Sequence, residues 1–267
     1  ARYHGPEGDA FAIDELTPVA ERFCAKGRVL EVGCGYGRNL VALAATSARS
    51  IVGCDVARAE LDRAARERIA PLCEASRQRV SLVRQEPWRL PFAQGAFDLV
   101  VLWQVLEHVF RPEEKQRVLD ECVRVLRSGG HLLIETPNQW FPVDYHDNRV
   151  PLAHWFLPRA GREWLTWKIR GQRYYPSQYM SLGGYERLLR RAPGVMRIDR
   201  ATRFYFARGW SEAFRHLGGT QVGLKRAIFV AIAPVHFVLG LFGSTADHLL
   251  PSIRVVWRVA KGPGAAR

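Results

Sequence analysis

The sequence predicts an α/β fold built on a doubly wound parallel sheet, and two observations support this prediction. Short apolar segments suited to buried parallel strands alternate with segments of helical periodicity along the first half of the chain. The first such strand, Val29–Val32, leads into a turn that contains Gly33, Gly35 and Gly37, and a helix follows. Repeats of strand, helix and strand place parallel strands side by side with helices on both faces of the sheet.

The glycine turn is suited to bind a ligand. Glycine lets the backbone approach a ligand closely and adopt positive φ, and the start of the next helix offers unpaired N–H groups. A second apolar strand, Ser50–Asp55, ends in a carboxylate 20 residues after Gly35. An acid at this spacing in a βαβ unit binds a pair of ribose hydroxyls. The spacing alone is compatible with a nicotinamide cofactor, and the glycines alone with a plain tight turn.

Further along the chain, the motifs distinguish between these interpretations. The pattern Glu31-x-Gly33-x-Gly35-x-Gly37 differs from the G-x-G-x-x-G of dinucleotide sites and resembles the first motif of class I S-adenosylmethionine-dependent methyltransferases. The later motifs of that family have counterparts in the same order along this chain: Asp55, Glu86–Val101 and Leu126–Asn138. The last of these is closest to ubiquinone-biosynthesis O-methyltransferases. The resemblance covers roughly residues 20–140 and implies a Rossmann-like sheet of seven strands, the last of them antiparallel.

The resemblance also implies a cofactor and the residues that bind it. S-adenosyl-L-methionine would be the methyl donor and S-adenosyl-L-homocysteine the product. Glu31 would face the amino-acid end of the cofactor, Asp55 would bind the ribose and Glu86 the adenine edge. Trp88 would stack nearby, and Gln104 would lie beside the methionine portion. The predicted cofactor-binding residues are Glu31, Gly33, Gly35, Gly37, Asp55, Val56, Glu86, Pro87, Trp88 and Gln104.

Candidate catalytic groups follow the fourth predicted strand, Phe97–Trp103, because ligands lie beyond the carboxyl ends of strands in such sheets. Glu107 and His108 match a Glu-His pair of ubiquinone O-methyltransferases and small-RNA 2′-O-methyltransferases. His108 is the expected general base, since an imidazole accepts a hydroxyl proton near neutral pH. The competing interpretation is that this pair only orders the end of the strand.

The resembled families often hold a divalent metal with the pattern Glu-x-x-Glu-His. Here Gln104 stands in the place of the first acid. A neutral amide is a poorer magnesium ligand than a carboxylate, so we predict that no metal is used. The alternative is a metal held by Glu107, His108 and His154.

The pattern changes after Asn138. Residues 139–176 form an irregular run rich in aromatic and basic side chains, too long for a simple connection, and we predict an aromatic, apolar helical cap over the site. Tyr145 and His146 in this cap are expected to orient the acceptor and to complete the catalytic set with Glu107 and His108.

A second unusual segment, Ala227–Gly243, is 17 residues of nearly unbroken apolarity. Pro234 and His236 interrupt it, and the length is at the lower limit for a membrane span, so a spanning helix is not expected. A buried pair of cap helices and an interfacial membrane element are the two remaining interpretations. The basic residues that would flank such an element are Lys225, Arg226, Arg254 and Arg258.

These segments divide the chain as follows: residues 1–26, an N-terminal helix and lid; 27–138, the cofactor-binding core; 139–195, the aromatic cap; 196–207 and 252–262, the closing strands; and 208–251, the apolar helical insertion.

Composition restricts the setting and the partners. The chain has 267 residues, 48% of them apolar, enough for a substantial core. Its net charge of +13 favours an anionic partner such as a membrane surface, a phosphate-bearing molecule or a nucleic acid. The five cysteines have no metal-ligand or disulfide spacing, which indicates a reduced, cytoplasmic setting, with membrane association as an alternative if the apolar insertion docks there. They are Cys24, Cys34, Cys54, Cys73 and Cys122.

The sequence therefore predicts a methyltransferase that methylates the hydroxyl of a small or lipophilic acceptor, free or linked to a phosphate or a membrane. Alternatives are C- or N-methylation of a metabolite and 2′-O-methylation of RNA. A nucleic-acid partner is less expected because RNA sites pair basic residues with exposed stacking aromatics, not with a long apolar run. Outside enzymes, the alternative is an inactive module for cofactor binding or membrane docking.

Overall fold

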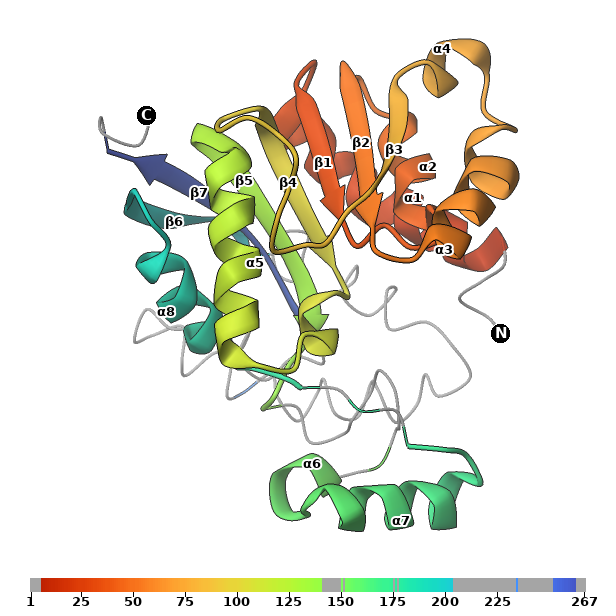
Figure 1. The fold of residues 1–267 in the computed structure, drawn as a ribbon, viewed down its shortest axis with the longest axis vertical. Coiled ribbons are helices and arrows are strands. Elements are labelled where there is room, and N and C mark those ends of the chain that lie inside the picture. The colour runs from red at the N-terminus through yellow and green to blue at the C-terminus, as the bar shows by residue number, and fades with distance from the viewer. Residues whose placement is uncertain are drawn as a thin grey trace.

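The computed structural model describes residues 6–140, 150, 152–174, 176, 178–203, 234 and 252–262. A seven-stranded sheet of order β3-β2-β1-β4-β5-β7-β6 forms its centre (Figure 1). Strands β1 to β5 run parallel, and β7 is antiparallel to both β5 and β6. The predicted fold class is confirmed. The strands are β1 (Arg28–Val32), β2 (Ser50–Asp55), β3 (Val80–Arg84), β4 (Phe97–Trp103), β5 (Leu126–Pro137), β6 (Val195–Arg203) and β7 (Ser252–Lys261).

Helices cover both faces of this sheet. One core cluster joins the sheet to α5 and α8 through residues such as Leu119 and Tyr185, and the other joins it to α1 and α2 through residues such as Leu16 and Leu40. Helices α6 and α7 lie apart from both layers, beyond the carboxyl ends of the parallel strands (Figure 1). The helical elements are α1 (Pro6–Cys24), α2 (Arg38–Ala44), α3 (Arg58–Ala64), η2 (Ala65–Ile69), α4 (Glu74–Arg77), η3 (Leu106–His108), α5 (Pro112–Val125), α6 (Ala153–Phe156), α7 (Arg159–Arg170) and α8 (Leu182–Arg191).

A buried ion cluster connects the first helix to the last strand. Arg254 of β7 pairs with Glu15 of α1 and lies 3.8 Å from a carboxylate oxygen of Glu135 on β5. All three side chains are buried, and the Arg254 guanidinium stacks over the Trp103 ring at 4.8 Å. Removing one partner of such a buried group would leave an uncompensated charge, so α1 is held firmly against the sheet.

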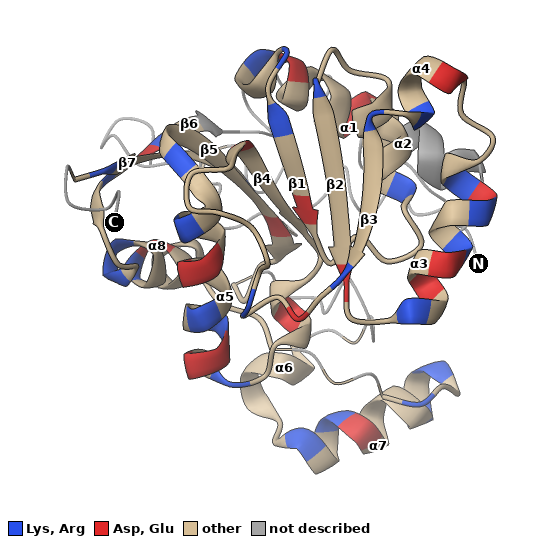
Figure 2. Ribbon diagram, turned by 45° about the horizontal axis from the view of Figure 1, so that its top comes forward, with Lys and Arg blue, Asp and Glu red and all other residues tan. Residues whose placement is uncertain are grey.

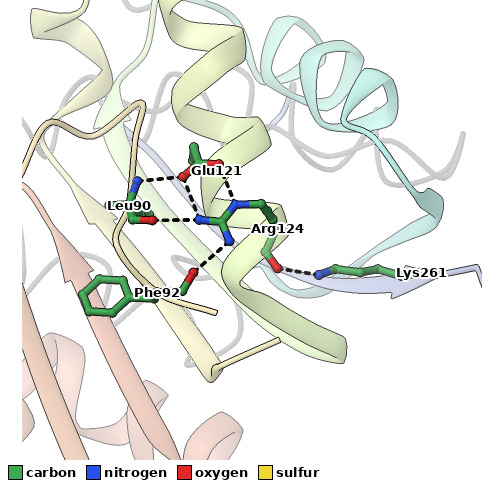
Figure 3. Close-up of polar contacts among 5 residues, drawn as sticks. All are labelled: Leu90, Phe92, Glu121, Arg124 and Lys261. Atoms are coloured by element: carbon green, nitrogen blue, oxygen red, sulfur yellow. Dashed lines mark hydrogen bonds and ion pairs between the residues drawn. The ribbon is translucent and has the colours of Figure 1, made fainter. Parts of the chain in front are cut away.

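A second polar cluster fixes the turn that follows β3 (Figure 3). Glu121 of α5 accepts a hydrogen bond from the Leu90 backbone N–H at 2.7 Å. Arg124, ion-paired with Glu121, donates to the carbonyl oxygens of Leu90 and Phe92, both at 2.8 Å. Lys261 of β7 in turn donates to the Arg124 carbonyl at 3.1 Å. The Glu121–Arg124 pair therefore anchors residues 90–92 through their backbone, immediately after the predicted adenine-binding segment.

Several predicted boundaries need correction. The apolar spacing within Ala10–Cys24 predicts a helix that starts at Ala10, and α1 begins four residues earlier, at Pro6. The run Ala57–Leu72, rich in Ala, Arg, Glu and Leu, predicts a single crossover helix, and the structure has α3, which continues as the π-helical segment η2. Residues 139–176, the predicted cap, contain helices α6 and α7, and α7 alone has 12 residues. The sequence prediction of a helical cap gave no bounds for these two helices.

Two sequence predictions fall partly outside the part of the chain that the structure describes. Residues 141–149 and nearly all of 208–251, including the apolar run, are among those not described. Within the described ranges, no helix combines the length and the apolarity that crossing a bilayer requires.

Candidate functional site

The glycine turn lies at the carboxyl end of β1, where the strand order reverses between β1 and β4. The backbone N–H groups of Gly33 and Cys34 both donate to the carbonyl oxygen of Cys54, at 2.8 and 3.0 Å, which joins the turn to β2. Gly33 has a φ of 75°, and a Cβ there would stand 2.5 Å from a methyl carbon of Val105, beyond β4. The close approach of the two strand ends therefore requires glycine at this position. Ligands of open α/β sheets bind at this kind of switch point.

Asp55, at the end of β2, is held against the same turn. One of its carboxylate oxygens accepts from the Gly35 N–H at 2.8 Å, and the other accepts from the Ala57 N–H at 2.9 Å. Gly35 has a φ of 50°, and a Cβ on it would meet no atom within 4 Å. The turn therefore presents an open space beside a partly exposed carboxylate. Each oxygen retains a further lone pair for a hydroxyl donor such as a ribose diol.

Glu31 is buried in β1, and its two carboxylate oxygens differ. Oε1 accepts a hydrogen bond from the Asn39 side-chain amide at 2.7 Å, whereas Oε2 is buried and has no hydrogen-bond partner. The carbonyl oxygen of Asn39 is likewise buried without a partner. Burial raises the pKa of Glu31 to about 8, opposed by the Asn39 bond and by the charge of Arg38. Two neighbouring residues with unsatisfied buried acceptors suit a ligand with several N–H donors, such as an ammonium group.

The adenine side of the predicted site is open. Glu86 is exposed, and so are the side chains of Trp88 and Val56, while Pro87 is half-buried. These residues follow β2 and β3, beside the glycine turn in the sheet order. The Gln85 N–H donates to the Asp55 carbonyl at 3.0 Å, which sets the start of the Glu86 segment against the end of β2.

Gln104 follows β4 in a strained conformation. Its φ of 57° is uncommon for a residue other than glycine. Its backbone N–H donates to the carbonyl oxygen of Glu135 on β5 at 2.8 Å. Strain of this kind persists only where the surroundings impose it, and it is concentrated at functional sites.

The next residues, in η3, are fixed by buried polar contacts. Glu107 is fully buried and accepts a hydrogen bond from the Thr136 hydroxyl at 3.0 Å. That hydroxyl lies 3.5 Å from the phenol oxygen of Tyr185, and burial raises the pKa of Tyr185 above its ordinary value. The Glu107 carbonyl accepts from the Gln178 N–H at 2.8 Å. Glu107 is therefore positioned as a structural anchor at the end of β4.

Lys115 of α5 holds the same segment from the helix side. It is buried, and its ammonium donates to the carbonyl oxygens of Leu106 and Gln178, the second at 2.9 Å. Burial lowers the pKa of Lys115 to about 8, against the opposing charge of Glu107. Because Leu106 and Glu107 are both tied down, the orientation of the adjacent His108 is fixed by the fold.

His108 is half-buried, in contrast to Glu107. It lies directly beyond β4, on the side of the sheet from which a ligand would approach. His154 contacts the Gln139 carbonyl at 3.3 Å, the same oxygen to which the Trp155 indole donates at 2.7 Å. Among the described residues, no group of three or more His, Cys, Asp or Glu side chains is arranged to hold a metal.

Two of the predicted catalytic residues, Tyr145 and His146, lie outside the described residues. Other contributors were not identified in the sequence: Asn39, Lys115, Thr136, Gln178 and Tyr185. Asn39 had a local signal, since it stands in the first turn of the helix after the glycines. Thr136, Gln178 and Tyr185 come from segments distant in sequence, and only the fold brings them to Glu107, whereas Lys115 lies in α5, the next helix along the chain.

Comparison with known proteins identifies the class. Residues 30–134 match the family model described as a methyltransferase domain. The methyltransferase GfsG of Streptomyces halstedii is 32% identical over 142 residues, which are 49% of this chain and 49% of GfsG. The tRNA N(3)-methylcytidine methyltransferase Mettl2 of Drosophila melanogaster is 36% identical over 126 residues, 45% of this chain and 38% of that protein.

A more distant relative is the ubiquinone biosynthesis O-methyltransferase of Alkalilimnicola ehrlichii, 25% identical over 146 residues that make up 52% of this chain and 56% of the relative. The chain thus spans about half or less of the length of these relatives. A solved S-adenosylmethionine-dependent methyltransferase from Mesorhizobium loti has the same fold, with a TM-score of 0.56 and 15% identity, over 92% of this chain and 99% of that structure.

The sheet order and the glycine turn are those of class I S-adenosylmethionine-dependent methyltransferases, and residues 30–134 match a methyltransferase domain. The predicted family and methyl donor are confirmed, and the donor is S-adenosyl-L-methionine. The unsatisfied acceptors of Glu31 and Asn39 and the open space at Gly35 fit this cofactor.

Proposed function

We propose that the protein transfers a methyl group to a hydroxyl of a small or lipophilic acceptor, with His108 as the general base. The observation that carries this proposal is the contrast between two adjacent residues: Glu107 is fully buried and bound to Thr136, whereas His108 is only half-buried, directly beyond β4. An accessible imidazole held by a fixed backbone is suited to accept a proton from an approaching hydroxyl group.

The cofactor residues have separate tasks in this proposal. S-adenosyl-L-methionine supplies a methyl group already activated on a sulfonium, so the protein needs mainly to align and shield the reactants. The unsatisfied acceptors of Glu31 and Asn39 receive the N–H donors of its amino-acid end. Asp55 accepts from the ribose hydroxyls, and Glu86 and Trp88 flank the adenine. Gln104 lies beside the methionine portion.

The residues of this chain need to carry out only one chemical step, the removal of the acceptor proton. His108 would accept the proton of the acceptor hydroxyl as that oxygen takes up the methyl group, and the bound cofactor would supply the sulfonium leaving group, which keeps the carbon–sulfur electron pair. Glu107, fixed by Thr136 and by the Gln178 backbone, keeps η3 in place and acts as a positioning residue. Tyr145 and His146 are proposed to orient the acceptor from the cap.

Methylation of a nucleic acid is the second candidate. The net charge of +13 and the similarity to a tRNA methyltransferase favour it. C- or N-methylation of a metabolite requires no hydroxyl proton acceptor, so the role of His108 separates it from the first proposal.

The test measures S-adenosyl-L-homocysteine formation by the purified protein with three sets of acceptors: lipophilic phenols and alcohols, the corresponding amines, and transfer RNA. We expect turnover with hydroxyl acceptors, and we expect His108→Gln to lower kcat at least about 100-fold while the dissociation constant of the cofactor stays unchanged. The rise of kcat with pH that reports an ionising base should disappear in the variant.

A matched control is His131→Gln. His131 lies in β5, away from His108, and its ring is 4.7 Å from that of Phe23. The His131→Gln variant should keep kcat within about twofold of the wild-type value. Methylation of amines or of transfer RNA with no methylation of hydroxyl acceptors would overturn the proposal. Equal loss of activity in the two histidine variants would show that His108 has no specific role.

A further inference from the structure

The surface of the cap helices is unusually apolar for a part of the chain that meets solvent. Large hydrophobic side chains stay uncovered along α6 and α7, and several expose more than half of their surface: Phe156 (73%), Trp164 (62%), Trp167 (65%) and Ile169 (55%). Leu152 and Trp155 are also exposed. Half of the exposed large hydrophobic residues in the described part of the chain thus fall between residues 152 and 169. A concentration of this kind marks an interaction surface.

The helical arrangement places the aromatic side chains together. Trp164 and Trp167 are three residues apart in α7, so they lie on the same face of the helix. The side that contacts the rest of the protein is a different one, because Thr166 is buried and Arg162 and Leu165 are half-buried. The two indole rings are therefore free to meet a partner without any rearrangement of the helix.

Basic residues accompany this aromatic face. Helix α7 carries Arg159, Arg162, Lys168 and Arg170 against a single acid, Glu163, which is paired with Arg159. Figure 2 shows basic segments at both ends of the helix, beyond the carboxyl ends of the sheet. Lys168 follows Trp167 directly, and Arg170 is the last residue of the helix. Tryptophan and phenylalanine beside exposed Lys and Arg are the composition of helices that lie in the interface of an anionic membrane.

The contacts that hold the cap support the same interpretation. The Trp155 indole donates to the Gln139 carbonyl just after β5, and Arg162 donates to the Leu157 carbonyl at 3.0 Å. These bonds anchor the base of the cap and do not use the two exposed indoles of α7. A surface attached at its base and apolar at its outer face can enter a lipid headgroup region while the sheet stays in water.

We propose that α6 and α7 form a docking surface that places the protein on an anionic lipid bilayer. Phe156, Trp164 and Trp167 enter the interface, and Lys168 and Arg170 contact the lipid phosphates. This surface includes neither His108 nor the cofactor-binding residues, so the proposal stands or fails separately from the proposed methyl transfer.

Flotation of the purified full chain with vesicles tests the proposal. We expect binding at low salt to phosphatidylcholine vesicles that contain about a third phosphatidylglycerol, and much weaker binding to phosphatidylcholine alone. Lys168→Gln with Arg170→Gln should weaken binding about 30-fold, from about 1 kcal/mol per charge. Trp164→Ala with Trp167→Ala should weaken it at least about tenfold. Added salt should reduce binding of the wild type.

The control removes two charges elsewhere. Arg58→Gln with Arg66→Gln, on the exposed side of α3 and η2, should change binding less than about twofold. The charge variant of α7 gives an independent measurement if the double tryptophan variant does not fold. Equal effects of the two charge pairs would overturn the proposal, as would unchanged binding by all α7 variants, which would assign docking to another segment.

Two further outcomes would replace the lipid partner. If the wild type is dimeric in solution and the tryptophan variant is monomeric while vesicles are ignored, the surface binds a second copy of the chain. If vesicles are ignored and transfer RNA binds through Lys168 and Arg170, the surface is a nucleic-acid site. Either result would overturn docking on a bilayer.

Discussion

The cofactor half of the molecule and its cap use similar residues for opposite purposes. In the sheet, Trp257 is fully covered, and Arg254 is enclosed by two carboxylates and an indole ring. In α7, Trp164 and Trp167 are mostly exposed and the basic residues lie beside them. The type of a side chain therefore does not show whether it stabilises this protein or binds a partner, whereas the degree of its burial does.

The largest expected effect on stability comes from removing a tryptophan from the core, compared with removing one from the cap. Trp257→Ala removes a fully buried indole from the core between the sheet and α8, and should lower the free energy of unfolding by about 3–5 kcal/mol. Trp164→Ala should change it by less than about 0.5 kcal/mol, because its side chain already meets water. Urea unfolding of the two variants measures both values. A loss above about 1 kcal/mol for Trp164→Ala would mean that the cap is packed as the core is.

A smaller effect is expected at the clamp on the turn after β3. Arg124→Ala removes the charged donors to the Leu90 and Phe92 carbonyls and should lower the free energy of unfolding by about 2 kcal/mol. It should also weaken cofactor binding, because the clamped residues directly follow Glu86 and Trp88. Thermal unfolding and titration calorimetry measure the two quantities. Arg197→Ala is the control, since its ion pair with Asp199 is exposed and contributes about 0.5 kcal/mol or less.

The last expected effect concerns Glu31 and depends on pH. Burial raises the pKa of Glu31 from 4.5 to about 8, so the folded protein keeps a proton that the unfolded chain releases near pH 4.5. Stability is therefore full below about pH 4.5 and falls as pH rises toward 8. Glu31→Gln has no such proton to lose. Its free energy of unfolding should match that of the wild type below about pH 4.5 and exceed it by a margin that grows as pH rises to 8.

The same variant should bind S-adenosyl-L-homocysteine less tightly at pH 8, because the neutral amide offers no charge to the amino-acid end of the ligand. Calorimetry at the two pH values tests this expectation. If Glu31→Gln is more stable at pH 8 and binds as tightly as the wild type, the carboxylate is a buried structural group and has no part in ligand binding.

The sequence was sufficient to predict the core and insufficient for the cap. Strand β4 was predicted with its observed bounds, Phe97–Trp103, because buried parallel strands are continuous apolar runs. The glycine turn and Asp55 were found because their spacing follows from one βαβ unit. Helix α7 received no bounds from the sequence because Trp164 and Trp167 face solvent, whereas the usual helical pattern places large apolar side chains on the buried face.

The residues around Glu107 could not be predicted for a different reason. Thr136, Gln178 and Tyr185 reach it only after β5 and α8 have packed against α5, and no local pattern records contacts across such separations. Asn39 is the intermediate case: its place after the glycines was visible, but its bond to Glu31 depends on the angle between α2 and β1.

The pairing of Glu15 with Arg254 spans 239 positions of the chain, and it has a consequence for how the protein is made. Until Arg254 leaves the ribosome, the first helix has no cation for its buried carboxylate, and β5 lacks its antiparallel neighbour. The nascent chain must therefore hold an incomplete sheet, with the edge of β5 unpaired, until the last strand has been synthesised. Loss of the final strand would disrupt the packing of the first helix, at the far end of the sequence.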